Sequence, residues 1–179
     1  MFNGHELLLE SLTKYFKANK DYEKILVELI NGKHSISLRM LDWLVTHYAK
    51  ANNIIYWIDS NTDFIIESEP INKDDAMNLK KIMLYIEYRA QLKSYTKFNF
   101  DPFRRRERIV YKIDENTTIE TTIGQLNFFR WVFNNRLIDY AIKYNKTILT
   151  HMSVGKKNKD FNILNQKINY KSCVIVKFN

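Results

Sequence analysis

The spacing of apolar residues constrains the fold most, because it switches between helical and alternating periods along the 179-residue chain. Recurrence every three to four residues indicates amphipathic helices, whereas alternation indicates half-buried strands. Only four glycines and two prolines interrupt these patterns, which argues against a loop-rich fold. Helical spacing predicts helices over residues 4–18, 21–31, 35–51, 73–94, 122–134 and 136–149.

Short runs rich in β-branched and aromatic residues separate these helices and predict strands. Asp59-Ser60-Asn61 is a turn signal inside the first such unit, and Asp101-Pro102 is another before the second. The predicted strands cover residues 54–58, 64–66, 105–113, 117–121 and 172–178. The predicted class is therefore α+β, with helices packed on a small antiparallel sheet, a helical N-terminal third, and a buried helix pair after a central basic hairpin at 105–121.

The composition is that of one globular domain, predicted to cover residues 1–179. Hydrophobic residues make up 45% and charged residues 27%, which argues against global disorder. The single cysteine, Cys173, excludes an internal disulfide, and no uncharged stretch approaches the length of a membrane span. Glu6 and Glu10 flank the first apolar run, which is wrong for a secretory signal. We expect an intracellular protein without a membrane partner.

The net charge of +8 is unevenly distributed. Residues 1–72 hold seven cations and ten carboxylates, residues 73–112 hold eleven and five, and residues 113–179 hold ten and five. An acidic first part therefore precedes a basic remainder. The partner of the basic part should be anionic: nucleic acid, an acidic protein or another polyanion.

Four of the eight arginines fall within residues 104–108. If this segment is a strand, alternation places Arg104, Arg106, Arg108, Val110 and Lys112 on one face, and Arg105, Glu107, Ile109, Tyr111 and Ile113 on the other. The first face would be almost wholly cationic, and guanidinium groups suit phosphate oxygens. The predicted anion-binding residues are Arg104, Arg105, Arg106, Arg108, Lys112, Lys93 and Lys97. The alternative is a solvated strand face, or structural ion pairs to the acidic first part.

Aromatic residues beside this segment have two interpretations. Phe98, Phe100 and Phe103 are core or turn anchors, or they are platforms on which unpaired bases stack. A DNA-reading helix-turn-helix over residues 122–149 is disfavoured, because five apolar residues between 128 and 133 make its first helix apolar nearly all round, as in a buried helix. The lysine-rich stretch 156–159 is a weaker basic patch.

No catalytic motif is legible. The four histidines and one cysteine have no metal-ligand spacing, and the chain has no glycine-rich phosphate loop or nucleophile elbow. We therefore expect no catalytic residues, no metal and no cofactor. A catalytic site assembled from distant residues is the third-ranked alternative.

Three segments carry a resemblance to a known family: residues 37–46 (SLRMLDWLVT), 100–105 (FDPFRR) and 121–131 (TTIGQLNFFRW). Over residues 35–150 the chain resembles a family of uncharacterised proteins of nucleocytoplasmic large DNA viruses, which include giant amoebal viruses. The resemblance implies a viral protein located in the virion, or in the cytoplasm or nucleus of an infected cell.

The sequence therefore predicts a non-enzymatic viral protein that binds nucleic acid or another polyanion through a basic strand, in genome packaging or in the virion. The alternative is an assembly protein without nucleic acid. Its basic strand would meet an acidic viral or host partner, or the acidic part of a second copy in a homo-oligomer.

Overall fold

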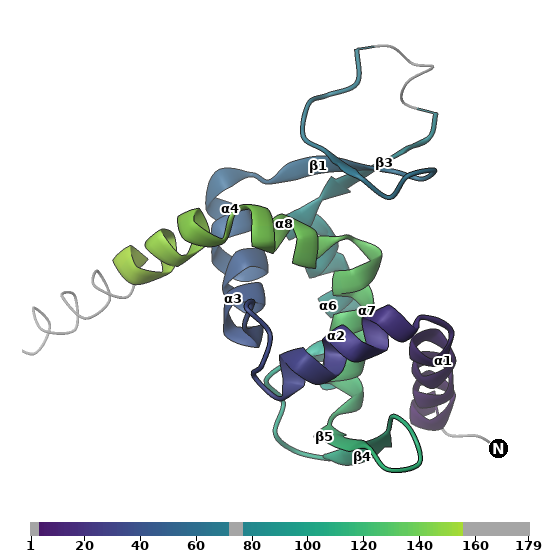
Figure 1. Ribbon diagram of the computed structural model, residues 1–179. Helices are drawn as coiled ribbons and strands as arrows, with labels where there is room; N and C mark the ends of the chain where they lie inside the picture. Colours follow the sequence, from purple (N-terminus) through teal and green to yellow (C-terminus); the bar gives the residue numbers. More distant parts are fainter. Residues whose placement is uncertain (1–3, 72–76, 156–179) are drawn as a thin grey trace, which may run out of the picture.

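The computed structural model describes residues 4–71 and 77–155. Within this part, helices surround two long central helices, a small antiparallel sheet lies at one end, and a two-stranded ribbon lies at the other (Figure 1). The predicted α+β class with a helical N-terminal part is confirmed. The strand predicted over 172–178 and the lysine-rich stretch 156–159 lie outside the described residues.

The described elements follow the chain in this order. The helices are α1 (Gly4–Ala18), α2 (Lys20–Ile30), α3 (Leu38–Trp43), the π-helical turn η1 (Leu44–Tyr48), α4 (Ala49–Asn52), α6 (Leu84–Phe100), α7 (Ile123–Asn134) and α8 (Leu137–Lys143). A further helical stretch covers residues 145–155. The strands are β1 (Ile55–Asp59), β2 (Ile65–Ile66), β3 (Leu79–Met83), β4 (Ile109–Lys112) and β5 (Thr118–Thr121).

The first helices form where the spacing predicts them, with one interruption. In α1 the predicted stripe buries Leu12 and Phe16 completely. The helix predicted over 35–51 begins later than expected, because the hydroxyl of Ser37 accepts a hydrogen bond from the backbone N–H of Met40 at 3.1 Å. After α3 the helix continues through the wider π-helical turn η1 and ends with α4.

The sheet has the order β2-β1-β3, so the predicted hairpin of β1 and β2 is confirmed and a third strand is added. The prediction of a helix from residue 73 is wrong for Leu79–Met83, which forms β3. Ile82 pairs with Tyr56 across this ladder, and long-range pairing of this kind overrides local helical spacing. The helical phase differs as well, because Leu84 and Tyr88 are buried whereas Ile86 is 56% exposed.

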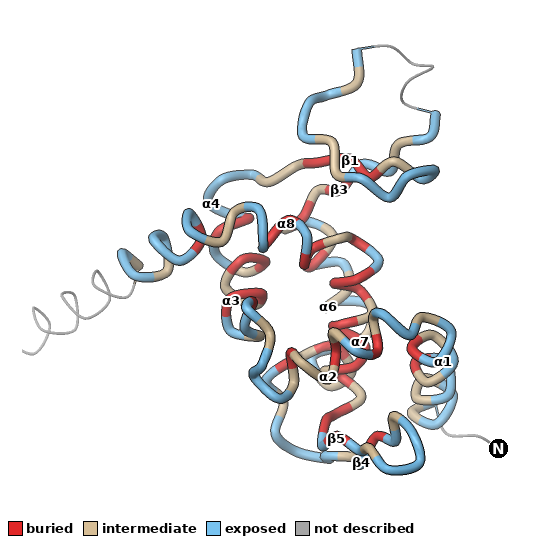
Figure 2. The backbone as a smooth tube through the Cα atoms, viewed as in Figure 1, coloured by how far each residue is buried: buried red, intermediate tan, exposed pale blue. Residues whose placement is uncertain are grey.

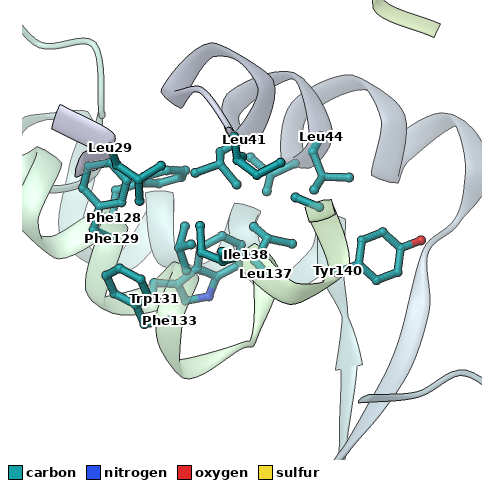
Figure 3. Packing of buried hydrophobic residues seen from close by; sticks show 14 of the residues in the cluster. Leu29, Leu41, Leu44, Phe128, Phe129, Trp131, Phe133, Leu137, Ile138 and Tyr140 are labelled. Carbon is teal, nitrogen blue, oxygen red and sulfur yellow. The ribbon is translucent and has the colours of Figure 1, made fainter. Parts of the chain in front are cut away.

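One cluster of buried side chains connects the elements, from Leu12 in α1 to Ile148 after α8. Helix α7 passes through it and is buried on most sides (Figure 2). Its aromatic residues pack against leucines of the surrounding helices (Figure 3). Helix α7 begins at a capping residue, since the Thr122 hydroxyl accepts from Gln125 N at 3.1 Å.

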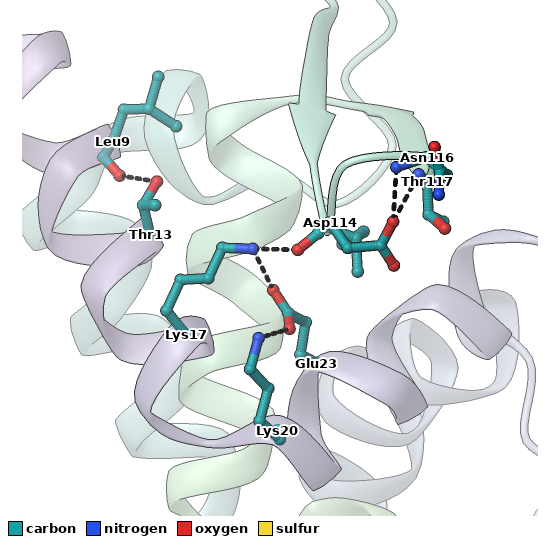
Figure 4. Close-up of polar contacts among 9 residues, drawn as sticks. Leu9, Thr13, Lys17, Lys20, Glu23, Asp114, Asn116 and Thr117 are labelled. Carbon is teal, nitrogen blue, oxygen red and sulfur yellow. Dashed lines mark hydrogen bonds and ion pairs between the residues drawn. The ribbon is translucent and has the colours of Figure 1, made fainter.

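The β4–β5 ribbon is held against α1 and α2 by a buried carboxylate (Figure 4). Glu23 of α2 is 3% exposed and lies 2.7 Å from Lys20 Nζ and 3.1 Å from Lys17 Nζ. Lys17 Nζ also donates a hydrogen bond to the backbone carbonyl of Ile113, at the end of the ribbon. This arrangement fixes the position of the ribbon and of the loop that leads into it.

Candidate functional site

The loop from α6 to β4, residues 101–108, lies over the first turn of α7. The contact is close because of Gly124, where a Cβ atom would lie 3.1 Å from the carbonyl oxygen of Phe98 and 3.2 Å from that of Asp101. The turn predicted at Asp101-Pro102 is confirmed: the Asp101 carboxylate accepts from Phe103 N at 2.9 Å. The loop that carries the arginines is thereby anchored to both central helices.

Two of the predicted anion-binding arginines are neutralised within the protein. The guanidinium carbon of Arg104 lies 3.6 Å from the ring centroid of Phe98, and its Nη2 lies 3.4 Å from a carboxylate oxygen of Glu107. Arg108 Nη1 lies 2.9 Å from a carboxylate oxygen of Glu120. The prediction of an unpartnered cationic row is therefore wrong for Arg104 and Arg108.

The prediction of a strand over 105–113 is also wrong in its first half. Glu107 has a φ of 58°, a left-handed conformation that ends any alternation, and β4 begins only at Ile109. Within β4 the alternation does hold: Tyr111 is buried, and Val110 and Lys112 are exposed. The ribbon predicted as basic holds four cations and four carboxylates between residues 105 and 121, so it carries no net charge.

The remaining predicted cations, on α6, the loop after it and β4, are what we call the cationic surface: Lys93, Lys97, Arg105, Arg106 and Lys112. All five are exposed, and among residues 4–71 and 77–155 none pairs with a carboxylate. The excess charge lies mainly at the end of α6 and in the loop after it, where residues 93–106 hold five cations against Asp101.

The sequence prediction did not include Arg89, although this residue is exposed and lies four residues before Lys93, one helical turn away.

A hollow of about 200 Å³ lies beside this loop, at the first turn of α7. Arg104 and Arg106 line it, together with Glu107 and the residues that begin α7. The first turn of α1 reaches the same place, where the ring of His5 lies 4.5 Å from that of Phe98. Helix N-termini carry partial positive charge, so this end of the molecule favours anions beyond its formal charges.

The three aromatic residues beside the basic segment have different environments. Phe100 is fully buried and packs against Phe128 and Trp131, and Phe98 lies between Arg104 and His5. The interpretation as a core anchor is confirmed for Phe100, whose full burial leaves no face for a base, whereas Phe98 is half-buried outside the core cluster. Phe103, which is 46% exposed, retains a ring open to solvent.

Sequence reasoning missed a polar cleft of about 660 Å³ between α1, α6 and α7. Its floor is a polar stripe on α7, whose sequence signal is the helical spacing of Asn127, Arg130 and Asn134. The full lining comprises Ser11, Tyr15, Lys80, Glu87, Gln91, Tyr95, Asn127, Arg130, Trp131, Asn134 and Asn135.

An aromatic groove of about 770 Å³ lies between η1, the start of α6 and residues 150–155. Trp43 and His47 stack in its wall with ring centroids 4.2 Å apart. In the described part of the chain, no three His, Cys, Asp or Glu side chains are placed to hold a metal ion. No helix among the same residues is both long enough and apolar enough to span a membrane.

Comparison with known proteins identifies the family. The model of a family of unknown function, DUF7197, matches residues 2–176. The chain belongs to this family. Uncharacterized protein L507 of Acanthamoeba polyphaga mimivirus is 35% identical over 159 residues, covering 86% of the chain and 56% of that protein. The chain thus spans little more than half the length of this relative, and the resemblance to a giant-virus family is confirmed. No solved structure matches the chain.

Proposed function

We propose that this DUF7197 protein binds nucleic acid, without strong sequence preference, through the cationic surface. The proposal rests on one observation: Lys93, Lys97, Arg105, Arg106 and Lys112 are exposed and have no carboxylate partner among the described residues, although two arginines of the same segment do. The density of such cations sets this segment apart, because residues 93–106 hold five cations against Asp101.

The physical argument is electrostatic. Like charges close together repel, and an anion placed between them relieves that repulsion. Phosphates along a nucleic-acid backbone supply such anions in series, and the two exposed guanidinium groups of Arg105 and Arg106 match phosphate oxygens in geometry. Contacts of this kind position the backbone and do not read base edges, which is why little sequence preference is expected.

Family membership adds a setting to this proposal. A protein of a family with a giant-virus member, carrying such a surface, would serve in genome packaging, in the virion core or at the site of viral replication in the host cell. Each of these settings presents nucleic acid at high density. None requires catalysis from this chain.

A salt titration tests the proposal. Fluorescence anisotropy with labelled single-stranded and duplex oligonucleotides should give a log affinity that falls with log salt, at about −0.9 per phosphate neutralised on duplex, hence about −4.5 for five contacts. Replacing Arg105 and Arg106 with alanine should make the slope shallower by about 2. The Lys81→Ala, Lys146→Ala double variant loses the same charge away from the ribbon end (Figure 1) and should keep the parental slope. Equal effects of the two double variants would refute a localised interface.

The assembly alternative also has a supporting observation. Val110 is 75% exposed on the outer side of β4, and Phe103 is 46% exposed in the preceding loop, so apolar surface adjoins the cations. Such a mixture suits an acidic protein partner, for example the acidic first part of a second copy. This alternative predicts concentration-dependent dimerisation in sedimentation equilibrium that Val110→Ser weakens, with no nucleic-acid affinity at physiological salt.

A further inference from the structure

Hydrogen-bonding side chains line most of the polar cleft. Helix α7 is buried on most sides, yet the buried Asn127 and the half-buried Arg130 lie on it, and the buried Asn135 directly follows it. Buried polar side chains are costly unless they are paired. Their partners therefore show how the cleft is organised.

Arg130 is held in place by neutral acceptors. Its guanidinium group donates to Asn127 Oδ1 at 2.8 Å, to Ser11 Oγ at 3.1 Å and to the Tyr95 hydroxyl at 3.4 Å. Among the described residues no carboxylate pairs with it. Its orientation is therefore fixed by three helices while its charge remains available to an anion.

Lys80 supplies a second fixed cation at the other end of the stripe. Its Nζ donates to Asn135 Oδ1 at 2.8 Å, and the Asn135 amide group in turn donates to the carbonyl of Trp131 at 2.9 Å. Glu87 of α6 is the one carboxylate in the lining, against the cations Lys80 and Arg130. The lining thus has an excess of one positive charge.

Trp131 contributes an unpaired donor. Its side chain lines the cleft and is 6% exposed, and its indole Nε1 is buried without a hydrogen-bond acceptor. Because the Trp131 side chain lines the cleft, its indole N–H reports on a molecule bound there.

We propose that this cleft binds a small organic oxyanion, a molecule with a phosphate or carboxylate group and further hydroxyl groups. The oxyanion pairs with the cations of the lining, Lys80 and Arg130, and the amides and hydroxyls of the lining meet the rest of the molecule. A volume of about 660 Å³ suits a metabolite, because small-molecule sites occupy about 300–1,000 Å³. This site is separate from the cationic surface, with which it shares no residue.

Two-dimensional NMR of the whole chain tests the site directly. Each tryptophan gives one indole N–H resonance, and the resonance of Trp131 is identified by its loss in Trp131→Phe. Ribose 5-phosphate and citrate serve as the phosphate and carboxylate probes, and ribose is the neutral match to the first. Saturable movement of the Trp131 resonance with either anion, and none with ribose, supports the proposal. No movement with either anion, or equal movement with ribose, refutes it.

Two neighbouring lysines provide a matched pair of variants. Lys80→Gln removes a cation from the cleft and should weaken binding about tenfold, as expected for a lost charge-assisted hydrogen bond. Lys81→Gln makes the same change of charge one residue along β3, where Nζ instead lies 5.5 Å from the Trp57 ring, and should leave affinity unchanged. Equal weakening by both variants would show only general surface electrostatics and would overturn the proposal.

Retained binding of the oxyanion probes in the Arg105→Ala, Arg106→Ala variant would separate this site from the nucleic-acid surface.

Discussion

A single carboxylate, that of Glu23, joins three parts of the chain. Because it is buried between Lys17 and Lys20, its removal breaks both ion pairs and leaves Lys17 with only its hydrogen bond to the Ile113 carbonyl of the ribbon. We expect Glu23→Ala to lower the free energy of unfolding by about 2–3 kcal/mol, less than a fully buried pair because both lysines are partly exposed. Urea denaturation measures the loss. Glu10→Ala, which breaks the exposed pair to Lys14, is the control and should leave the midpoint unchanged.

Glu87, which lines the polar cleft, makes the stability of the fold depend on pH. Partial burial raises the pKa of this carboxyl, although Lys80 opposes the shift. Ionisation of Glu87 therefore lowers the free energy of unfolding as pH rises above the unfolded pKa. The neutral side chain of Glu87→Gln does not ionise, so the variant does not lose this stability. The melting temperature of Glu87→Gln relative to the parent should increase between pH 4 and pH 7.

Glu67 offers a control of opposite sign. Burial would raise the pKa of its carboxyl, but hydrogen bonds from Lys143 and Tyr144 lower it overall. The ionised Glu67 carboxylate therefore stabilises the folded state above the unfolded pKa, and this stabilisation is lost as pH falls. Glu67→Gln should therefore be less stable than the parent at pH 7, and this difference should shrink toward pH 3. The same trend with pH for both glutamine variants would contradict the environments described for these carboxylates.

At the scale of elements, the contact between α6 and α7 positions the basic loop. An alanine at Gly124 would place its Cβ 3.1–3.3 Å from three backbone atoms of residues 98–101, so the helices would have to separate. We expect Gly124→Ala to cost about 1–3 kcal/mol by calorimetry, despite the better helix propensity of alanine. Gly4→Ala has no atom within 4 Å of the new methyl group and should be neutral or slightly stabilising.

The sequence predicts elements well where local signals suffice. The helix at residues 4–18, the turn at Asp101-Pro102 and the first hairpin all depend on residues close in the chain, and all three are confirmed. Strand β3 was missed because its partner is β1, more than twenty residues away. No local spacing reports such a partner.

The strand prediction for the basic segment is wrong for a different reason. Alternation assumes that a strand is already present, whereas Arg104 turns back onto the ring of Phe98 and onto Glu107. These contacts favour a turn, which the left-handed Glu107 completes. The polar cleft depends on three helices meeting, so only the spacing of Asn127, Arg130 and Asn134 along one helix was visible beforehand.

At the scale of the molecule, charge and core are organised differently. The net charge separates into an acidic first part and a basic remainder, whereas the buried cluster runs from Leu12 to Ile148 without such a division. Nucleic acid held at the ribbon end and an oxyanion held in the cleft would therefore both act on one packed core. Ligands that bind only the folded state should then raise the same unfolding temperature.

The continuous core gives the last prediction. Leu12 and Ile148 are fully buried at opposite ends of the described chain, so removing either should destabilise the whole unit. We expect Leu12→Ala and Ile148→Ala each to cost about 2–4 kcal/mol and to move one shared transition. Far-ultraviolet circular dichroism reports the helices, and fluorescence reports Trp43, Trp57 and Trp131 in three different elements. Coincident curves in both variants follow from two-state unfolding of one domain. If Leu12→Ala shifted only part of the ellipticity and left the tryptophan transition in place, the N-terminal helices would be a separate folding unit.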